Sequence, residues 1–302
     1  MGKFKTYFLS TRPQFFPAVI LPVTMGTSYA LYKGAAFDEW VFFLALIAAV
    51  ACHAGMNVLN DYFDSLSKAD EMNLTPLTPF TGGSRMIQNG LMSQGETLLL
   101  SLVLLFIGSA IGLYLVWLKG IFILVIGVLG LLTGALYSAP PVFLAGRGLG
   151  EITVFLNFGL LTLSGAYFLQ AGNLTLDAMI VSLPIGFLIA AILYVNEFPD
   201  YESDKASGKR NLVVRLTPKR ARYGMFIIGA MTYLSVVIPV ITGYLPLRFL
   251  AGVISLPFFL KASMDVMSFY QIPDSMKKPI KLVILSHVLT GAAITIAFLL
   301  PQ

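Results

Sequence analysis

Charge is scarce in this chain of 302 residues: Asp, Glu, Lys and Arg make up only 12% of it, against about 25% in soluble domains. Hydrophobic residues reach 57% and the mean hydropathy is +0.82. This composition excludes an ordinary soluble protein and predicts a polytopic membrane protein. The single cysteine, Cys52, excludes an internal disulfide and a metal site built from several cysteines.

Long apolar runs are what the chain has instead. A helix needs about 20 residues to cross a bilayer core of about 30 Å. The first run contains Pro17 and Pro22 and is followed by many more spans, so we interpret it as a retained helix and not as a cleaved signal. With no soluble segment between the runs, residues 1–302 are predicted to form one all-α transmembrane domain. The nine predicted spans are residues 13–32, 39–60, 96–118, 120–139, 150–170, 174–196, 221–243, 247–266 and 280–300.

Basic residues sort to one side of these spans. If the N-terminus is cytoplasmic, all but three of the 20 Lys and Arg residues lie on the cytoplasmic side. The exceptions are Lys33, Lys119 and Arg248. The positive-inside rule then predicts a cytoplasmic N-terminus and a C-terminus on the opposite side. The net charge of +5 reflects this topology and not a nucleic-acid surface, because the basic residues are scattered over short loops.

The first of the two long cytoplasmic loops begins with the stretch "NDYFD". Asn57, Asn60, Asp61 and Asp64 follow one another at spacings of three and four, so they share one face at the end of the second span. Asp70 follows beyond that helical turn, and its role stays open. So does the role of the Pro- and Thr-rich segment 71–81.

The second long cytoplasmic loop repeats this pattern in "NEFPDYESD". Asn196, Asp200 and Asp204 are spaced by four and are predicted to share one helical face. Two carboxylates about 6 Å apart repel by about 3 kcal/mol at an effective dielectric near 20. Protonation, pairing with Lys or Arg, or divalent cations can each offset this repulsion. Oxygen ligands without His or Cys favour Mg²⁺ over zinc, and Mg²⁺ is commonly shared with substrate phosphates.

Basic residues lie beside both clusters. Lys205, Lys209 and Arg210 follow the second, and Arg85 follows two glycines in the first loop. Cations on a diphosphate stabilise it as a leaving group, although positive-inside topology explains these residues equally well. Arg85 and Lys209 are the preferred candidates for catalysis. A diphosphate on a hydrocarbon tail fits the membrane setting, so the predicted substrate is an isoprenyl diphosphate.

Four further residues are weaker candidates. His53 lies on the face of Asn57 and is predicted to bind the acceptor or take its proton, with structural hydrogen bonding as an equal alternative. Tyr137 and Ser138 in "YSAPP" are candidates for contact with the diphosphate. Glu151 is interpreted as a favourable charge at the start of a span.

These motifs resemble a known family. "NDYFDSLSKAD" and "NEFPDYESDKASGKRNLVVRL" are similar to the two Asp-rich motifs of the UbiA-type intramembrane prenyltransferases. The resemblance covers essentially the whole chain. "TGGSRMIQNGLMSQGE", "LYSAPP" and "GLGEITVFLNFG" are most similar to the branch that prenylates 1,4-dihydroxy-2-naphthoate in menaquinone synthesis.

The resemblance implies nine helices in a bundle around a central cavity open to the cytoplasm, and two Mg²⁺ ions on the diphosphate. Asp61 and Asp64 would hold one ion, and Asp200 and Asp204 the other. It also implies transfer of the prenyl group to an aromatic ring carbon with release of CO₂. The predicted substrate-binding residues are Asn57, Asn60, Asn196, Lys205, Arg210, Tyr137, Ser138 and His53.

Other functions stay open at this stage. The same chemistry on 4-hydroxybenzoate, homogentisate, a chlorin or a glyceryl phosphate lipid is the main alternative. A cation transporter is more distant, because the aspartates gather at helix ends and not at mid-membrane. A non-catalytic scaffold leaves both acidic clusters unexplained. Prenyl length and oligomeric state are not readable from the sequence.

Overall fold

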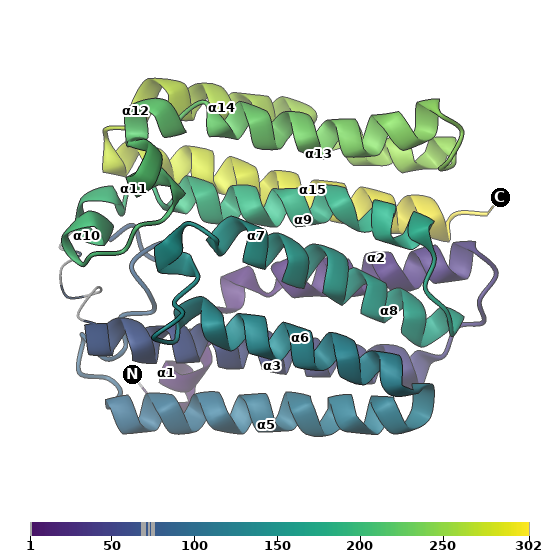
Figure 1. The fold of residues 1–302 in the computed structure, drawn as a ribbon, viewed down its shortest axis with the longest axis horizontal. Helices are drawn as coiled ribbons and strands as arrows, with labels where there is room; N and C mark the ends of the chain where they lie inside the picture. Colours follow the sequence, from purple (N-terminus) through teal and green to yellow (C-terminus); the bar gives the residue numbers. More distant parts are fainter. Residues whose placement is uncertain (1, 68–70, 72, 74–75, 302) are drawn as a thin grey trace.

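The computed structural model describes residues 2–67, 71, 73 and 76–301. In this part of the chain every regular element is a helix, and the long helices run side by side along one axis (Figure 1). The all-α prediction is therefore confirmed. The elements are α1 (Lys3–Ser10), η1 (Pro13–Phe15), α2 (Pro17–Tyr32), α3 (Glu39–Ser67), α5 (Gln94–Lys119), α6 (Ile121–Ser138), η2 (Ala145–Arg147), α7 (Gly150–Val154), η3 (Phe155–Leu161), α8 (Thr162–Ala171), α9 (Leu176–Asn196), α10 (Tyr201–Ala206), α11 (Leu212–Leu216), α12 (Pro218–Ala221), α13 (Gly224–Ile241), η4 (Leu247–Ser255), α14 (Leu256–Phe269), η5 (Pro273–Met276) and α15 (Lys277–Leu299).

Eight helical segments of the described chain are long and apolar enough to cross a membrane. A further candidate is the pair Lys3–Phe15 and Pro17–Tyr32, which is bent by 56°. The chain is thus a multi-pass membrane protein, as its composition predicts. One boundary differs clearly from the prediction, because α3 continues past residue 60 to Ser67. The first Asp-rich motif therefore lies within the last turns of a helix and not in a loop.

Helix α9 forms the centre of the bundle. It packs against α13, α15, α7 and η3, and it lies between the α13–α15 side and the α3, α5 and α6 side (Figure 1). In its most apolar stretch 72% of the residues are buried, against 17% for α5. The second Asp-rich motif follows α9 directly, so the most enclosed helix of the protein positions it.

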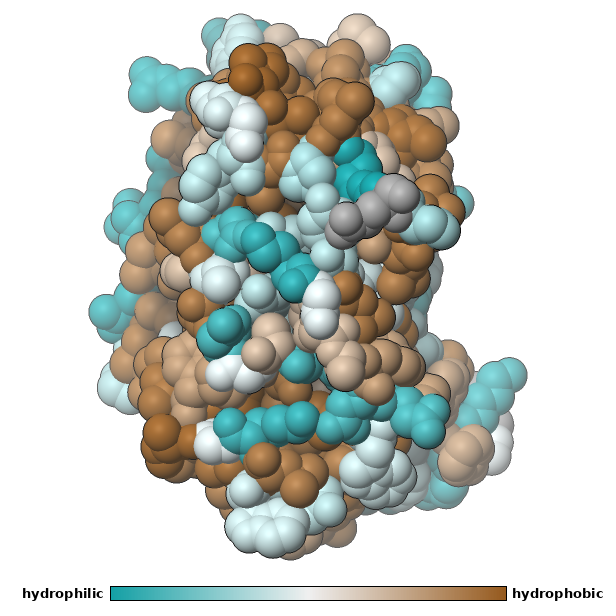
Figure 2. Space-filling view, turned by 90° about the vertical axis from the view of Figure 1, so that its right-hand side faces the viewer, coloured by the Kyte–Doolittle hydropathy of each residue, from teal (hydrophilic) through white to brown (hydrophobic). Residues whose placement is uncertain are grey.

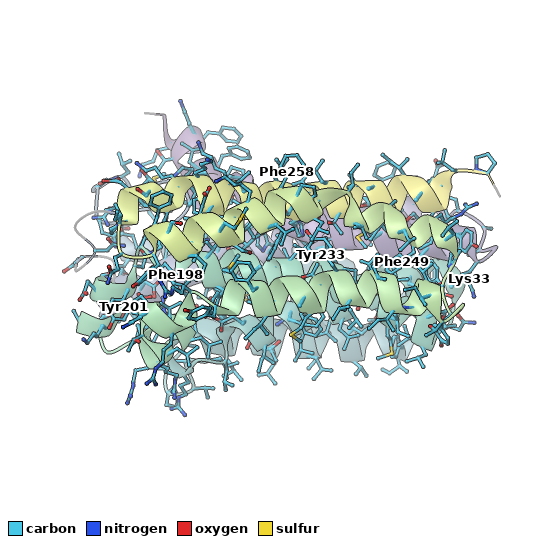
Figure 3. The ribbon with its side chains drawn as sticks, turned by 90° about the horizontal axis from the view of Figure 1, so that it is seen from above. Lys33, Phe198, Tyr201, Tyr233, Phe249 and Phe258 are labelled. Carbon is cyan, nitrogen blue, oxygen red and sulfur yellow. The ribbon has the colours of Figure 1, made fainter. Side chains whose placement is uncertain are left out.

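The ends of the bundle differ in character. The N-terminus, α10 and α11 lie at one end and the C-terminus at the other (Figure 1). Seen from above, Phe198 and Tyr201 mark the first end and Lys33 the opposite one (Figure 3). Polar groups gather among hydrophobic ones on the C-terminal end (Figure 2). Two ion pairs form there, Lys33 with Asp177 at 2.8 Å and Lys119 with Asp38 at 3.0 Å.

Close contact between α2 and α8 depends on Gly26. A Cβ atom at this position would lie 2.4 Å from the backbone oxygen of Leu163. We expect Gly26→Ala to destabilise the protein by about 1–3 kcal/mol, because backbone must move to relieve the overlap. Gly127→Ala is the control, since its Cβ would meet nothing within 4 Å. Thermal unfolding in detergent measures both, and equal melting temperatures would contradict this packing role.

Candidate active site

A cavity of about 650 Å³ runs inside the bundle. Its walls are formed by residues of α2, α3, α5, α6, α7, η3, α8, α9 and α10. Asp64, Asp200 and Asp204 line one end of it, and the apolar side chains of Leu115, Ile123 and Leu169 line another part. The last three belong to one hydrophobic cluster with Val41 and Ala45. A single space thus combines an acidic region with an apolar one, and both long polar stretches of the sequence meet there.

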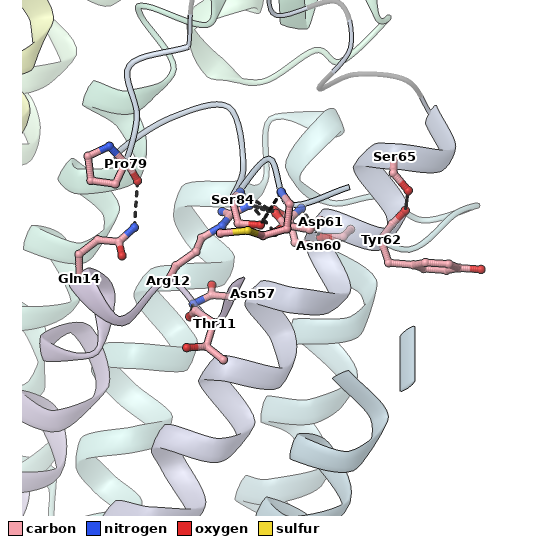
Figure 4. A network of polar contacts seen from close by, with 12 residues as sticks. Thr11, Arg12, Gln14, Asn57, Asn60, Asp61, Tyr62, Ser65, Pro79 and Ser84 are labelled. Carbon is pink, nitrogen blue, oxygen red and sulfur yellow. Dashed lines mark hydrogen bonds and ion pairs between the residues drawn. The ribbon is translucent and has the colours of Figure 1, made fainter. Parts of the chain in front are cut away.

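The first motif divides its side chains between two environments. Asn57, Asn60 and Asp64 line the cavity, and Asn60 donates to the Ser138 hydroxyl at 2.9 Å. Asp61 is not among the lining residues. Its buried carboxylate accepts a bond from the Arg12 guanidinium and lies 3.3 Å from the Ser84 backbone nitrogen (Figure 4).

Arg12 is a site residue that the motif analysis did not single out. It lines the cavity, and its backbone adopts a left-handed conformation with φ of 55° between α1 and η1. This bend directs the chain so that the guanidinium meets Asp61 and lies 3.5 Å from the Asn60 amide oxygen. The only sequence signal was its place, a basic residue directly before the first apolar run.

The second motif is not the continuous helical face that its spacing predicts. Helix α9 ends at Asn196, a turn follows, and α10 begins at Tyr201. Asn196, Asp200 and Asp204 nevertheless all line the cavity. The amide oxygen of Asn196 is buried with no hydrogen-bond partner among the described residues. An oxygen left unpaired at this place is a ready ligand for a bound group.

Amide side chains hold the two aspartates of this motif. Asn73 donates to Asp200 at 2.9 Å. Asn211 donates to Asp204 at 2.7 Å, while its own oxygen caps α11 by accepting from the backbone N–H of Val214. Burial raises the pKa of Asp200 above its usual value and that of Asp204 to about 6, although Lys209 opposes both shifts. Negative charge is therefore costly here, and bound cations would relieve that cost.

Lys209 is the cation at the centre of this acidic region. Its ammonium lies 3.4 Å from Asp204, and the residue lines the cavity. Burial alone would lower the pKa of Lys209, but the carboxylates of Asp204 and Asp64 raise it above its usual value. The side chain is therefore charged, and it faces the same space as the aspartates.

The other predicted basic residues lie outside the cavity lining. Arg85 donates to the backbone oxygen of Asn73 at 3.1 Å, which ties it to the segment that holds Asp200. Lys205 is exposed and lies over the Tyr201 ring. Arg210 is exposed, and its backbone N–H donates to Gly146 at 2.9 Å. Asp70 lies outside the described residues.

The remaining candidates, Tyr137, Ser138 and His53, all line the cavity. His53 Nε2 lies 3.2 Å from the Asn57 amide nitrogen. Since that nitrogen is a donor, Nε2 accepts this bond and carries no proton. The imidazole ring also meets Phe158 edge-on, with ring centroids 5.2 Å apart.

The sequence of residues 19–298 matches the pattern of the UbiA prenyltransferase family. The chain belongs to this family. The match covers nearly all of the described bundle, including both Asp-rich motifs and most of the cavity lining. Recognition from the motifs is therefore confirmed over most of the sequence.

Two curated relatives are similar to this UbiA family member over most of their length. It is 28% identical to the 1,4-dihydroxy-2-naphthoate octaprenyltransferase of Mycobacterium leprae, over 91% of this chain and 90% of that protein. It is 26% identical to the 2-carboxy-1,4-naphthoquinone phytyltransferase of Synechocystis, over 95% of this chain and 91% of that protein. Both names state a naphthalene-type acceptor, while their prenyl groups differ.

Two solved structures share the fold. A UbiA homolog from Archaeoglobus fulgidus bound to GPP and Mg²⁺ has a TM-score of 0.64 at 17% identity, covering 96% of this chain and 99% of that one. A digeranylgeranylglyceryl phosphate synthase has a TM-score of 0.60 at 18% identity, covering 99% of each chain.

The UbiA fold of this chain also buries a carboxyl pair that the motif analysis missed. Glu151 and Glu197 are each only 6% exposed, and Glu197 accepts from the Val213 backbone N–H at 3.2 Å. Burial and the neighbouring Glu151 raise the pKa of Glu197 well above its usual range. Both carboxyl oxygens of Glu151 are buried without a hydrogen-bond partner among the described residues. Glu151 lies in the first turn of α7, as its position in the sequence suggested, but it is buried there.

Proposed function

We propose that this protein transfers a polyprenyl group from an isoprenyl diphosphate to 1,4-dihydroxy-2-naphthoate, in a Mg²⁺-dependent reaction of menaquinone biosynthesis. The observation that carries the proposal is the single cavity in which Asp64, Asp200, Asp204 and Lys209 accompany a large apolar space. A charged head with a hydrocarbon tail matches both of its regions.

The donor set fits a hard divalent cation. Asp64, Asp200 and Asp204 face one cavity, and the Asn196 amide oxygen there lacks a partner. Among the described residues no three acidic, His or Cys side chains converge closely enough to hold a metal ion on their own. Phosphate oxygens of the substrate would complete the shell, as is common for Mg²⁺.

Two Mg²⁺ ions are proposed, one at Asp61 and Asp64 and one at Asp200 and Asp204. Asp61 would exchange its bond with Arg12 for the first ion. When bound, the metal neutralises the charge that develops on the leaving diphosphate. The solved Archaeoglobus fulgidus homolog, which is bound to GPP and Mg²⁺, supports the use of a divalent metal with a prenyl diphosphate.

The chain's own residues then act on the substrates. Lys209 and Arg85 are proposed to stabilise the departing diphosphate, and the geometry adds Arg12. Further proposed binding residues are Asn57, Asn60, Asn196, Tyr137, Ser138, His53, Lys205 and Arg210. The bond between the prenyl C1 and the diphosphate oxygen breaks with its electron pair on oxygen. A ring carbon of the acceptor bonds to C1, and the ring carboxylate leaves as CO₂.

The proposed topology has nine membrane passes in one domain, residues 1–302, with the active site on the cytoplasmic side. The opposite positions of the two termini support an odd number of passes (Figure 1). The sorting of Lys and Arg supports a cytoplasmic N-terminus. In this orientation the site opens to soluble Mg²⁺ while the tail of the substrate stays within the bilayer.

The test is direct. Purified protein is incubated with Mg²⁺, geranylgeranyl diphosphate and one acceptor at a time, and products are identified by mass spectrometry. A prenylated, decarboxylated product from 1,4-dihydroxy-2-naphthoate, abolished by EDTA, is expected. Product from 4-hydroxybenzoate alone would move the assignment to another acceptor. No product from any acceptor would overturn the proposal.

A further inference from the structure

One membrane-spanning segment departs from α-helical geometry inside the cavity wall. Residues Phe155–Leu161 form a π-helix between α7 and α8, and π-helical turns are rare and occur often at functional sites. Asn157 lies in this turn and lines the cavity. A polar side chain within a membrane span is costly unless it has partners or a function.

The Asn157 carboxamide is held from two sides. Its nitrogen donates to the Thr153 backbone oxygen at 2.9 Å, and its oxygen accepts from the Thr133 hydroxyl on α6 at 3.0 Å. An Asn side chain has two N–H donors and two acceptor lone pairs. These two contacts use one N–H donor and one acceptor lone pair. The amide is therefore held in place, and it can still donate one hydrogen bond and accept another at the cavity wall.

Gly130 keeps the same amide accessible. A Cβ atom at Gly130 would lie 3.5 Å from the Asn157 amide oxygen, so most side chains at this position would cover it. Glycine within a helix costs about 1 kcal/mol relative to alanine. Gly130 therefore leaves room beside the Asn157 amide, the polar side chain of η3 that can bind a polar ligand atom.

Other cavity groups form a polar belt with Asn157, which we define as His53, Asn57 and Asn157. The Phe158 ring meets His53 edge-on at 5.2 Å, which links the η3 and α3 parts of the belt. His53 precedes Asn60 by seven residues, so it lies about 10 Å deeper along α3 at a rise of 1.5 Å per residue. His53 therefore lies deeper than the acidic end of the cavity, with Asn57 between the two.

A hydrocarbon tail cannot use hydrogen-bonding groups at this depth. An aromatic ring that carries hydroxyl or carboxylate groups can, and the cavity-lining rings of Phe158 and His53 offer it aromatic contacts. We infer that Asn157 binds the aromatic acceptor through a hydrogen bond to a polar ring substituent, and thereby positions the ring below the diphosphate. This inference rests on the proposed function, since it assigns the acceptor end of that reaction.

The experiment compares Asn157→Leu with Thr133→Val in the purified full-length protein. Both substitutions remove the bond between α6 and η3, but only the first removes a cavity-lining amide. For Asn157→Leu, we expect the KM for 1,4-dihydroxy-2-naphthoate to rise about 10-fold to 100-fold. The KM for geranylgeranyl diphosphate should stay within about 2-fold. Thr133→Val keeps the amide in the cavity and removes only one of its two supports, so it should raise the acceptor KM much less than Asn157→Leu does.

A second readout does not depend on turnover. Binding of 1,4-dihydroxy-2-naphthoate should raise the melting temperature of wild-type and Thr133→Val protein, and that shift should be lost in Asn157→Leu and kept in part in Asn157→Gln. Equal effects of Asn157→Leu and Thr133→Val in both assays would show that Asn157 only joins two helices, and would overturn the inference. Failure of the proposed function is distinguishable, because wild-type protein would then form no product from 1,4-dihydroxy-2-naphthoate.

Discussion

Asp204→Asn is expected to lower turnover by at least about 100-fold, the range seen when a group that stabilises developing charge is removed. Asp204 is 7% exposed, and its carboxylate is held in place by Asn211 at 2.7 Å and Lys209 at 3.4 Å. An amide of the same shape can still accept the Asn211 bond. It lacks the charge that a divalent cation needs, so metal-dependent ionisation should fail while the fold persists.

The matched control is Asp38→Asn, the same chemical change at the opposite end of the bundle. Asp38 pairs with Lys119 at 3.0 Å and lies far from the cavity aspartates along the helices. We expect near-normal activity in this variant. The two variants are compared by their initial rates over a series of Mg²⁺ concentrations and by their melting temperatures. Turnover of Asp204→Asn within about 3-fold of wild type would contradict its metal role.

Local periodicity explains why so much of this site was predictable. The spacing of the first motif predicts one shared face of α3, and Asn57, Asn60 and Asp64 do line the cavity. Asp61, predicted on the same face, does not line it and instead meets Arg12. The composition of the chain and the length of its apolar runs likewise predict the membrane-spanning helices. Helical periodicity does not reveal where a helix is interrupted, however. The turn between Asn196 and Tyr201 contains no Gly, and Pro199 is the only residue there that indicates a turn.

Partners distant in sequence could not be predicted in this way. Arg12 and Asp61 are 49 residues apart, and Asn73 and Asp200 are 127 apart. Their pairing depends on how α1, α3 and α9 assemble, which no local pattern encodes. The carboxyl pair of Glu151 and Glu197 was missed for the same reason, because each glutamate alone is typical of an exposed helix end.

The arrangement around Asp204 also suggests a reason for the amide residues beside the acids. Asn73 and Asn211 donate to the aspartates without neutralising them. A Lys or Arg at these places would satisfy the same oxygens but would compete electrostatically with a metal ion. The site therefore keeps its aspartates oriented while it leaves most of their charge available, and Lys209 and Arg12 are the balancing cations.

Lys209→Gln is expected to reduce turnover by about 100-fold to 1,000-fold, as removal of a positioned electrostatic group does. Its effect on the metal should be opposite to that of Asp204→Asn. Lys209 lies 3.4 Å from Asp204 and its charge acts on Asp64 and Asp200 as well. Without this competing cation the three carboxylates should bind Mg²⁺ or Mn²⁺ more tightly, whereas loss of a carboxylate should weaken binding.

Two variants separate this electrostatic role from a purely structural one. Lys209→Arg retains the charge and should recover part of the turnover, while Lys219→Gln, which removes an exposed cation ten residues away, should have little effect. Mn²⁺ affinity, measured by electron paramagnetic resonance without substrate, gives the sign directly. If Lys209→Gln weakens Mn²⁺ binding, the lysine stabilises the site as a structural partner of Asp204. If Lys209→Gln binds Mn²⁺ more tightly but has lost turnover, the lysine acts on the diphosphate of the substrate. Loss of a contact with the substrate explains why turnover falls although metal binding improves.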